Sequence, residues 1–218
     1  MKNIFVSFIY TILVRPWLTF IIGVSFHNIK PLKDANQFII VANHNSHFDT
    51  VSIMAALPSN KRKNTCAVAS GDYFGKSPFT VTLMKLFFNA ILITKKTKPG
   101  HLSNLELLDQ RIKEGKSLIM YPEGSRGNPG TISSFKKGIA KLLKENPSVP
   151  FIPVYLDGFG RVLPKNKILI VPLICKVRFG SPLFATTNDT KTTLEEVKKE
   201  ILNLKQKNER DRNQFDFN

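Results

Sequence analysis

Short apolar runs rich in β-branched residues alternate with segments of helical periodicity along the chain after Lys33. Turn residues separate the two, a pattern typical of an α/β domain. The apolar runs predict strands over Phe38–Ala42, Thr65–Ala69, Ala90–Thr94, Ser117–Tyr121, Phe151–Leu156, Ile168–Val171 and Ile174–Phe179. The helical periods predict helices over Thr50–Leu57, Ser77–Phe88 and Phe135–Glu145. We therefore expect a single domain with a central mixed, largely parallel sheet flanked by helices, preceded by an N-terminal pair of apolar helices.

Two further helices are predicted from their boundary signals. Ser103 and Glu106 have the spacing of a capping box, and Gly115 suits the end of that helix. The last helix begins at Thr192 or Thr193, and we expect a frayed tail beyond Lys205. Its apolar face repeats Leu194, Val197, Ile201 and Leu204. The expected organisation is a membrane-associating pair of helices over residues 1–29, a globular domain over 30–205 and a polar tail over 206–218.

The amino terminus is almost continuously apolar and aromatic from Ile4 to Phe26. Arg15 and Pro16 divide this stretch into two pieces of about ten residues, each too short to span a bilayer. A single span would place Arg15 near mid-membrane, and Pro16 would break or kink the helix. We therefore expect two short helices in one leaflet, with their aromatic residues at the interface. A secretory signal is one alternative, although no convincing cleavage site follows the apolar stretch. An ordinary buried helix is the other alternative.

The charge balance and the cysteines limit the functional classes. Thirty-two Lys and Arg residues against sixteen Asp and Glu residues give a net charge of +16, which attracts polyanions such as nucleic acid, anionic lipid or an acidic carrier protein. The basic residues are spread along the chain without a nucleic-acid-binding motif, so we expect no nucleic-acid partner. Cys66 and Cys175 lie in apolar runs and are expected to be reduced core thiols.

The first cluster of potentially catalytic residues is Asn43-His44-Asn45-Ser46-His47-Phe48-Asp49, between a predicted strand and a predicted helix. A histidine acts as a base on an alcohol when a carboxylate fixes its tautomer and stabilises the imidazolium. His44 and Asp49 can meet in this way if a helix begins at Asp49. The same spacing also fits a solvated or helix-capping histidine. His47 and Asp49 lack a third His or Cys and an HExxH motif, so we expect no metal.

The second cluster is Tyr121-Pro122-Glu123-Gly124-Ser125-Arg126-Gly127, at the end of another predicted strand. Gly124 and Gly127 let backbone amides approach a ligand closely. Arg126 offers a planar fork that suits phosphate oxygens. The alternative is a tight turn closed by a surface ion pair between Glu123 and Arg126.

Together, the two clusters resemble the glycerolipid acyltransferase family, and most closely its 1-acyl-glycerol-3-phosphate (lysophosphatidic acid) acyltransferases. The likeness also includes Phe135-Lys136-Lys137-Gly138 and Ile152-Pro153-Val154, and it covers roughly Ile29 to Pro182. It implies an enzyme that moves a fatty acyl group from a thioester to the free hydroxyl of 1-acyl-glycerol-3-phosphate, giving phosphatidic acid in phospholipid synthesis. It implies no cofactor, because acyl-CoA or acyl-carrier protein is a co-substrate.

The resemblance also implies roles for single residues. His44 would be the general base, and Asp49 would orient it. The acceptor phosphate would bind at Glu123, Gly124, Ser125 and Arg126, with Lys95 and Lys136 as further substrate-binding residues, and Pro153 would shape the wall of the acyl pocket. Residues 30–205 would form the acyltransferase domain. The apolar helices resemble those of members that sit on the cytosolic leaflet, so we expect binding to anionic lipid at the cytoplasmic face of the cell membrane.

Two departures from the family pattern bear on the acceptor. Ser125 stands where the family usually has Thr, which keeps a hydroxyl. Lys95 ends a segment that normally ends in Arg, and it keeps the charge but loses the bidentate fork. Acylation of another lysolipid, such as a lysophospholipid or an amino-acid lipid, is therefore an alternative. A non-catalytic basic module that binds membrane or nucleic acid is the alternative from another class.

Overall fold

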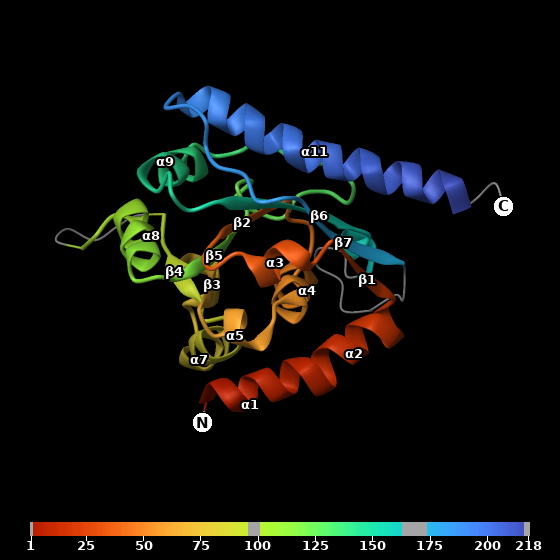
Figure 1. Ribbon diagram of the computed structural model, residues 1–218. Coiled ribbons are helices and arrows are strands. Elements are labelled where there is room, and N and C mark those ends of the chain that lie inside the picture. The colour runs from red at the N-terminus through yellow and green to blue at the C-terminus, as the bar shows by residue number, and fades with distance from the viewer. Residues whose placement is uncertain (1, 96–100, 163–173, 216–218) are drawn as a thin grey trace.

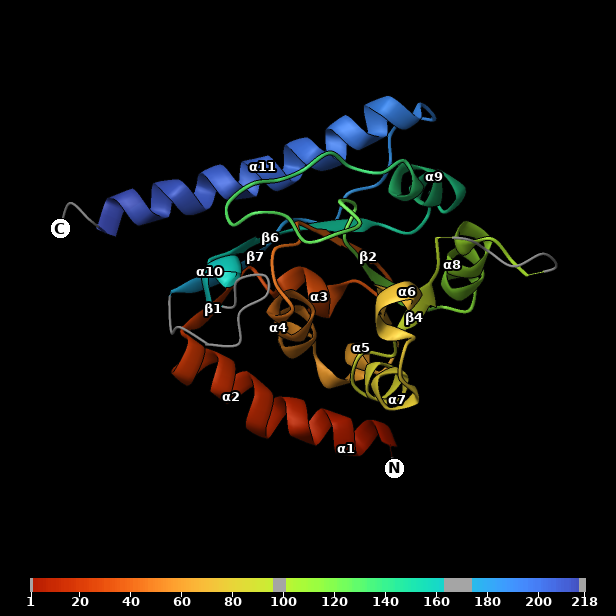
Figure 2. The same cartoon turned by 180° about the vertical axis from the view of Figure 1, so that it is seen from behind.

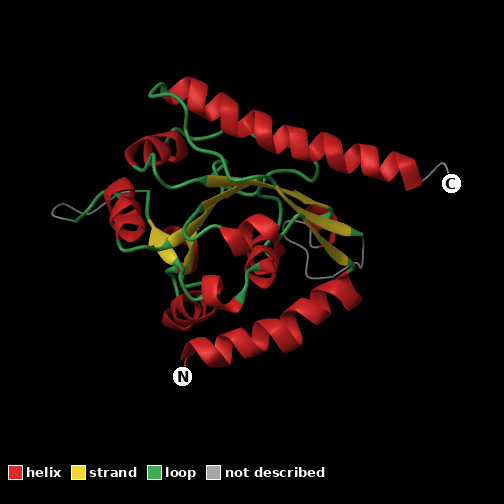
Figure 3. Cartoon of the chain, viewed as in Figure 1, coloured by secondary structure: helices red, strands yellow, loops and turns green. Residues whose placement is uncertain are grey.

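The computed structural model describes residues 2–95, 101–162 and 174–215, and within these ranges seven strands form one sheet between two layers of helices (Figure 1, Figure 3). The strand order is β1-β7-β6-β2-β5-β3-β4. Neighbouring strands are parallel except β6 and β7, which are antiparallel. The strands are β1 (Val24–His27), β2 (Ile39–Ala42), β3 (Thr65–Ser70), β4 (Ile91–Ile93), β5 (Ser117–Met120), β6 (Phe151–Asp157) and β7 (Cys175–Phe179). The expected mixed, largely parallel α/β sheet is confirmed.

Six of the predicted strands correspond to β2 through β7, while the predicted strand Ile168–Val171 lies outside the described residues. β1 was not predicted, because it lies in the apolar stretch that we expected to be helical. Gly23 ends the preceding helix in the left-handed region, at φ 83°, where glycine carries no steric penalty. Val24–His27 then pairs with β7 at the sheet edge. The expected boundary at residue 29 therefore does not separate the N-terminal segment from the sheet.

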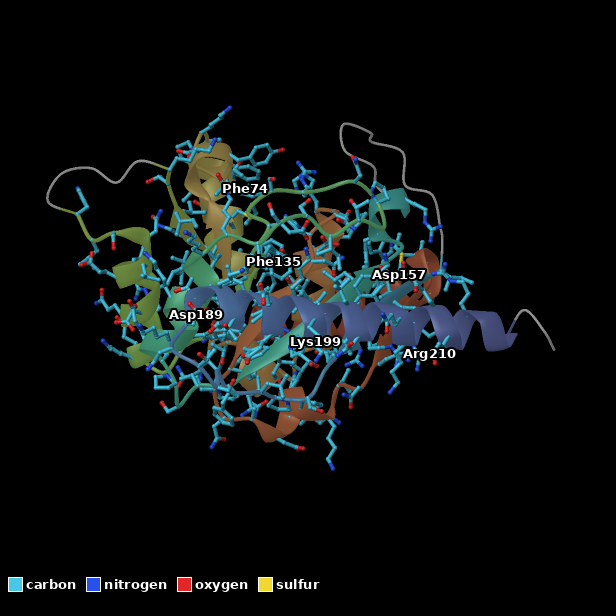
Figure 4. The ribbon with its side chains drawn as sticks, turned by 90° about the horizontal axis from the view of Figure 1, so that it is seen from above. Phe74, Phe135, Asp157, Asp189, Lys199 and Arg210 are labelled. Carbon is cyan, nitrogen blue, oxygen red and sulfur yellow. The ribbon has the colours of Figure 1, made fainter. Side chains whose placement is uncertain are left out.

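Helices cover both faces of the sheet (Figure 1). On one face, α4 (Phe48–Ala56) packs with the N-terminal helix against Ile40 and Ala42 of β2. On the other face, α9 (Gly138–Glu145) and α11 (Thr190–Phe215) pack against Ile39 and Val41, and Figure 4 shows α11 crossing the sheet. The remaining helices are α3 (Lys30–Asp34), α5 (Ser59–Arg62), α6 (Gly71–Phe74), α7 (Pro78–Phe87), α8 (Asn104–Lys113) and α10 (Phe159–Val162). Ser103 and Glu106 form the predicted capping box of α8.

The frayed tail beyond Lys205 was a wrong prediction, because α11 continues as a helix to Phe215. Polar contacts to the sheet hold this second half. Arg178 of β7 donates hydrogen bonds to Asn208 and Asp211. Arg212 donates to Asp157 of β6, with 2.6 Å between Nη2 and Oδ2. These contacts compensate for the scarcity of apolar residues in this part of the helix.

The N-terminal apolar segment is one continuous helix and not the expected pair split at Arg15 and Pro16. It runs through α1 (Lys2–Phe8), η1 (Ile9–Val14), α2 (Arg15–Trp17) and η2 (Leu18–Ile22). The η segments are π-helical, and the Arg15 N–H bonds the carbonyl of Tyr10, five residues back. This wider turn accommodates Pro16, which has no N–H to donate. Asn3–Ile22 is long and apolar enough to cross a membrane by length and composition, and 17% of its apolar window is buried.

One face of this helix belongs to the hydrophobic core. Its buried residues are spaced by multiples of four: Val6, Tyr10, Leu18 and Ile22. In a pure α-helix a spacing of four drifts by about 40° per step, and the π turns offset this drift. The opposite face exposes large apolar side chains at Ile4, Phe5, Phe8, Ile12, Leu13, Phe20 and Ile21.

Arg62 fastens the N-terminal helix to the domain. Its guanidinium donates to Ser7 of the helix, and to the carbonyls of Met54 and Leu57 at 2.9 and 2.7 Å. Its central carbon lies 4.8 Å from the ring centroid of Tyr10. The Tyr10 hydroxyl in turn donates to the carbonyl of Phe87. Deleting residues 1–29 would therefore expose core side chains and remove β1.

Candidate active site

Two loops meet where the carboxyl ends of β2 and β5 lie side by side. After β2 the chain crosses to β3 through α4 on one face, and after β5 it crosses to β6 through α9 on the other face. The connections therefore leave in opposite directions and open a crevice between the two strand ends. Ligand sites of open α/β sheets lie at such points. Residues 43–49 follow β2, and residues 121–127 follow β5, so both sequence clusters lie here.

His44 and Asp49 form a close pair at the start of α4. His44 Nδ1 lies 2.8 Å from Asp49 Oδ2, and the side chains are 20% and 0% exposed. Backbone N–H groups of Asn45 and Ser46 donate to the same oxygen at 2.7 and 2.8 Å. Because a carboxylate oxygen only accepts, Nδ1 carries the ring proton. Nε2 is then left with a lone pair that can accept a proton, which is the arrangement expected from the sequence.

Glu123 connects the two loops. Its Oε1 accepts the N–H of His44 at 2.9 Å, and its Oε2 accepts the N–H of Ser133 at 2.8 Å. The Gly127 N–H also donates to the carbonyl of His44 at 2.9 Å. Glu123 is buried, and both of its oxygens accept backbone N–H groups, so its side chain holds the two loops together. The described residues contain no ion pair between Glu123 and Arg126.

Tyr121 fixes the plane of the His44 ring. The two rings stack with centroids 4.1 Å apart and 18° between their planes. The Tyr121 hydroxyl lies 2.9 Å from Thr50 Oγ1, and burial raises the pKa of this phenol well above its ordinary value. The imidazole therefore has a carboxylate at one nitrogen and an aromatic face against its plane.

The remaining residues of the second cluster line the open side of the crevice. Gly124 has a φ of 72°, and a Cβ there would collide with the Lys136 side chain. Lys136 therefore lies over the turn, anchored by its N–H bond to the carbonyl of Pro122 at 2.8 Å. Arg126 is half-buried, and Ser125 is exposed. The turn thus carries an arginine and a hydroxyl, with a lysine over it, next to the loop that holds His44.

Arg126 is also close to His47. Burial, followed by the charge of Arg126, lowers the pKa of the His47 imidazole. The centroid of the His47 ring lies 6.0 Å from that of Tyr73 and 6.3 Å from that of Phe74, both in α6. Phe74 is labelled in Figure 4. Burial, and then repulsion by Arg126, therefore both favour the neutral form of the His47 imidazole.

Of the other expected site residues, Lys95 lies away from this group, and Pro153 lies in the strand next to β2. Lys95 follows β4, three strand positions from β2, or roughly 14 Å at about 4.8 Å per strand. Its N–H bonds Asp72, and its side chain is exposed. Pro153 is buried within β6 opposite Val41 and packs on Gly180. The fold brings together His44, Asp49, Glu123, Gly124, Ser125, Arg126 and Lys136.

Sequence reasoning missed three residues that shape the site. Asn43 joins the ends of β2 and β6, because its side chain exchanges two hydrogen bonds with the backbone of Leu156 at 2.8 and 2.9 Å. Tyr121 and Ser133 are the others. Asn43 and Tyr121 each begin one of the two sequence clusters, but stacking and loop clamping leave no local pattern that would assign these roles. Among the described residues, no group of three or more His, Cys, Asp or Glu side chains could hold a metal ion.

Comparisons with known proteins identify the family of this chain. The model of a family described as Acyltransferase matches residues 23–176. The 1-acyl-sn-glycerol-3-phosphate acyltransferase of Helicobacter pylori is 31% identical over 140 residues, which cover 62% of this chain and 54% of that protein. The human 1-acyl-sn-glycerol-3-phosphate acyltransferase beta is 27% identical over 132 residues, covering 60% and 45%. The chain spans about half the length of these curated relatives.

A solved structure shares the fold. The crystal structure of the 1-acyl-sn-glycerophosphate (LPA) acyltransferase PlsC from Thermotoga maritima superimposes with a TM-score of 0.67 and 21% sequence identity. The match covers 88% of this chain and 78% of that chain. At this identity the likeness concerns the fold.

Proposed function

Because the chain belongs to the acyltransferase family, we propose that it transfers a fatty acyl group from a thioester to the free hydroxyl of 1-acyl-glycerol-3-phosphate, giving phosphatidic acid. The observation that carries this proposal is the His44 and Asp49 pair, with its 2.8 Å contact beside an open turn that presents Arg126. The names of the relatives support the choice of acceptor.

The geometry supports a direct transfer. Nε2 of His44 takes the proton of the acceptor hydroxyl, and the oxygen attacks the thioester carbonyl carbon. A C–O bond forms, the C–S bond breaks, and the imidazolium returns the proton to the departing thiolate. Asp49 holds the productive tautomer and stabilises the imidazolium between these steps. The buried carboxylate and the Tyr121 stack keep the ring in place.

The acceptor phosphate is assigned to the turn that carries Gly124, Ser125 and Arg126, with Lys136 over it. A guanidinium can bind two phosphate oxygens at once. β5 and β2 are adjacent, so this turn lies within one strand spacing, about 4.8 Å, of the loop that holds His44. That separation suits a substrate whose hydroxyl and phosphate belong to one glycerol unit.

The acyl donor is acyl-carrier protein or a coenzyme A thioester. Acyl-carrier protein is acidic, and coenzyme A carries phosphates, so the net charge of +16 favours encounter with either. Both donors belong to the cytoplasm, which supports a place on the cytoplasmic face of the cell membrane.

The N-terminal helix is proposed to bind anionic lipid while lying in one leaflet. Crossing the bilayer would pull Tyr10, Leu18 and Ile22 out of the core and break the contacts of Arg62. Lying in the interface keeps that face on the domain and buries the exposed apolar face in lipid.

Acylation of a different lysolipid is the second candidate, and the position of Lys95 favours it. A cation roughly 14 Å from β2 suits a larger head group than a bare phosphate monoester. The discriminating experiment incubates the full-length protein with labelled acyl-CoA or acyl-carrier protein and a panel of lysolipids. Product formed from lysophosphatidic acid well above the other acceptors supports the first proposal. Preference for another lysolipid supports the second, and no product with any acceptor refutes both.

Arg126→Lys tests the phosphate assignment within the same assay. Lysine keeps the charge but loses the fork, so we expect the KM for the phosphorylated acceptor to rise more than the KM for the acyl donor. Arg111→Lys is the matched control, because Arg111 is a partly exposed arginine in the last turn of α8, near the amino end of β5, and it should leave the acceptor KM close to the wild-type value. Equal changes in both KM values for Arg126→Lys would mean that Arg126 supports the fold of the turn.

A further inference from the structure

The helix α7 exposes an apolar surface that the domain does not use. Its sequence is apolar apart from Thr80, Thr82 and Lys85, and it contains no buried residue. Phe79 is 71% exposed, and Leu83, one turn later on the same face, is 37% exposed. Tyr73, at the end of α6, is 55% exposed. A soluble surface rarely groups large apolar side chains in this way.

This surface continues that of the N-terminal helix. α7 lies beside the amino-terminal end of α1 in both views (Figure 1, Figure 2). Ile4, Phe5 and Phe8 of α1 are each more than half exposed, at 76%, 57% and 59%. Two separate parts of the chain therefore place exposed apolar side chains on the same side of the molecule.

The charge of these segments selects their partner. Residues 1–33 and 73–105 contain no Asp or Glu, although the chain has sixteen. They contain basic residues, among them Lys30, Lys33, Lys76 and Lys85. α6 also carries one exposed acid, Asp72. The excess of basic residues around these apolar side chains still matches an anionic bilayer surface, where each basic residue near the surface adds to the attraction.

The same segment reaches the crevice. Tyr73 and Phe74 of α6 contact the ring of His47, three residues from His44. We propose that α6 and α7 form a second lipid-contacting element, which lies in the head-group region of an anionic bilayer beside the N-terminal helix. With ten residues, α7 is about 15 Å long and cannot cross a bilayer. The inference rests on the proposed function, since a lysolipid acceptor would enter from this surface.

An introduced tryptophan tests the contact directly, because the chain has one tryptophan, Trp17. Phe79→Trp is made in a Trp17→Phe background, and the protein is mixed with vesicles of phosphatidylcholine and phosphatidylglycerol. We expect the emission of the introduced indole to shift to shorter wavelength and to be quenched by brominated lipid. Phe184→Trp in the same background is the control, because Phe184 is 53% exposed on the segment that leads to α11. Its emission should not change, and an unquenched indole at position 79 would overturn the proposal.

Binding measurements give a second readout. The double substitution Phe79→Ser and Leu83→Ser should weaken partition into these vesicles by about tenfold or more, whereas Phe184→Ser should not. If the emission shifts to shorter wavelength as protein concentration rises and is not quenched by brominated lipid, a second copy of the chain covers α7. That result would refute the proposal.

Acylation of lysophosphatidic acid in detergent micelles separates this inference from the proposed function. If the protein is active but the indole at position 79 is not quenched by brominated lipid, the membrane contact of α7 is refuted and the proposed function stands. If the indole is quenched but no lysolipid is acylated, the membrane contact is supported and the proposed function is refuted.

Discussion

Asp49→Asn is a nearly isosteric change that isolates the charge of the catalytic pair. Asp49 Oδ2 accepts N–H groups from His44, Asn45 and Ser46, whereas Oδ1 has no hydrogen-bond partner among the described residues. The two backbone donors would therefore keep the asparagine oxygen at the Oδ2 position and turn its NH2 group toward the position of Oδ1. His44 would keep its productive tautomer, and the loop would keep its shape.

The expected fall in kcat then comes from the missing negative charge opposite the imidazolium. Two unit charges about 4 Å apart interact with about 4 kcal/mol at an effective dielectric constant of about 20. A loss of about 4 kcal/mol in the transition state corresponds to a fall in kcat of roughly 10³-fold. KM for both substrates should stay near the wild-type value, because neither substrate contacts Asp49 in the proposed mechanism.

Asp49→Ala provides the contrast. It removes the acceptor as well as the charge and leaves the buried N–H groups of Asn45 and Ser46 unpaired, at about 1–3 kcal/mol each. Steady-state kinetics with labelled thioester, together with urea unfolding, separates the two variants. We expect Asp49→Asn to unfold near the wild-type midpoint and Asp49→Ala to unfold earlier. A kcat within tenfold of wild type for Asp49→Asn would refute the role of the charge.

Three further predictions concern groups that the fold places around the site. Tyr121→Phe keeps the stack on His44 and should retain most activity, whereas Tyr121→Leu should lower kcat by tenfold or more in the same assay. Arg62→Met leaves the carbonyls of Met54 and Leu57 without donors and should lower the free energy of unfolding by about 3 kcal/mol, measured in urea with Trp17 fluorescence. Burial and Arg126 lower the pKa of His47 below 6.5, so the unfolded chain binds more protons below about pH 6.5. The wild-type urea midpoint should therefore fall as pH drops through that value. His47→Gln should make the midpoint depend less on pH. The same dependence of the midpoint on pH in wild type and variant would contradict this role of His47.

The sequence alone determined the elements whose signals are local. Apolar runs identified β2 through β7, and the Ser103 and Glu106 spacing identified the start of α8. The two loops that carry potentially catalytic and substrate-binding residues were also found from sequence, because they follow buried strands directly. Parallel strands share an edge at their carboxyl ends, so both loops could be expected at the same edge of the sheet.

Tertiary contacts decided the two ends of the chain. β1 forms because β7 offers a sheet edge, and the N-terminal helix stays continuous past Pro16 because π turns and the Arg62 contacts hold one face on the core. The second half of α11 is helical because Arg178 and Arg212 bind it to the sheet. Local composition predicted a break or fraying at these points, since it contains none of these partners.

Within the site, the sequence determined which residue types were present, and the strand order decided which of them meet. Lys95 is distant from His44 because β5 and β3 lie between β2 and β4, an order that no local pattern encodes. Glu123 holds the loops because the N–H groups of His44 and Ser133 converge on its two oxygens. Tyr121 stacks on His44 because adjacent strand ends bring together rings that are 77 positions apart along the chain. Such contacts depend on distance in space, which the order of residues alone does not specify.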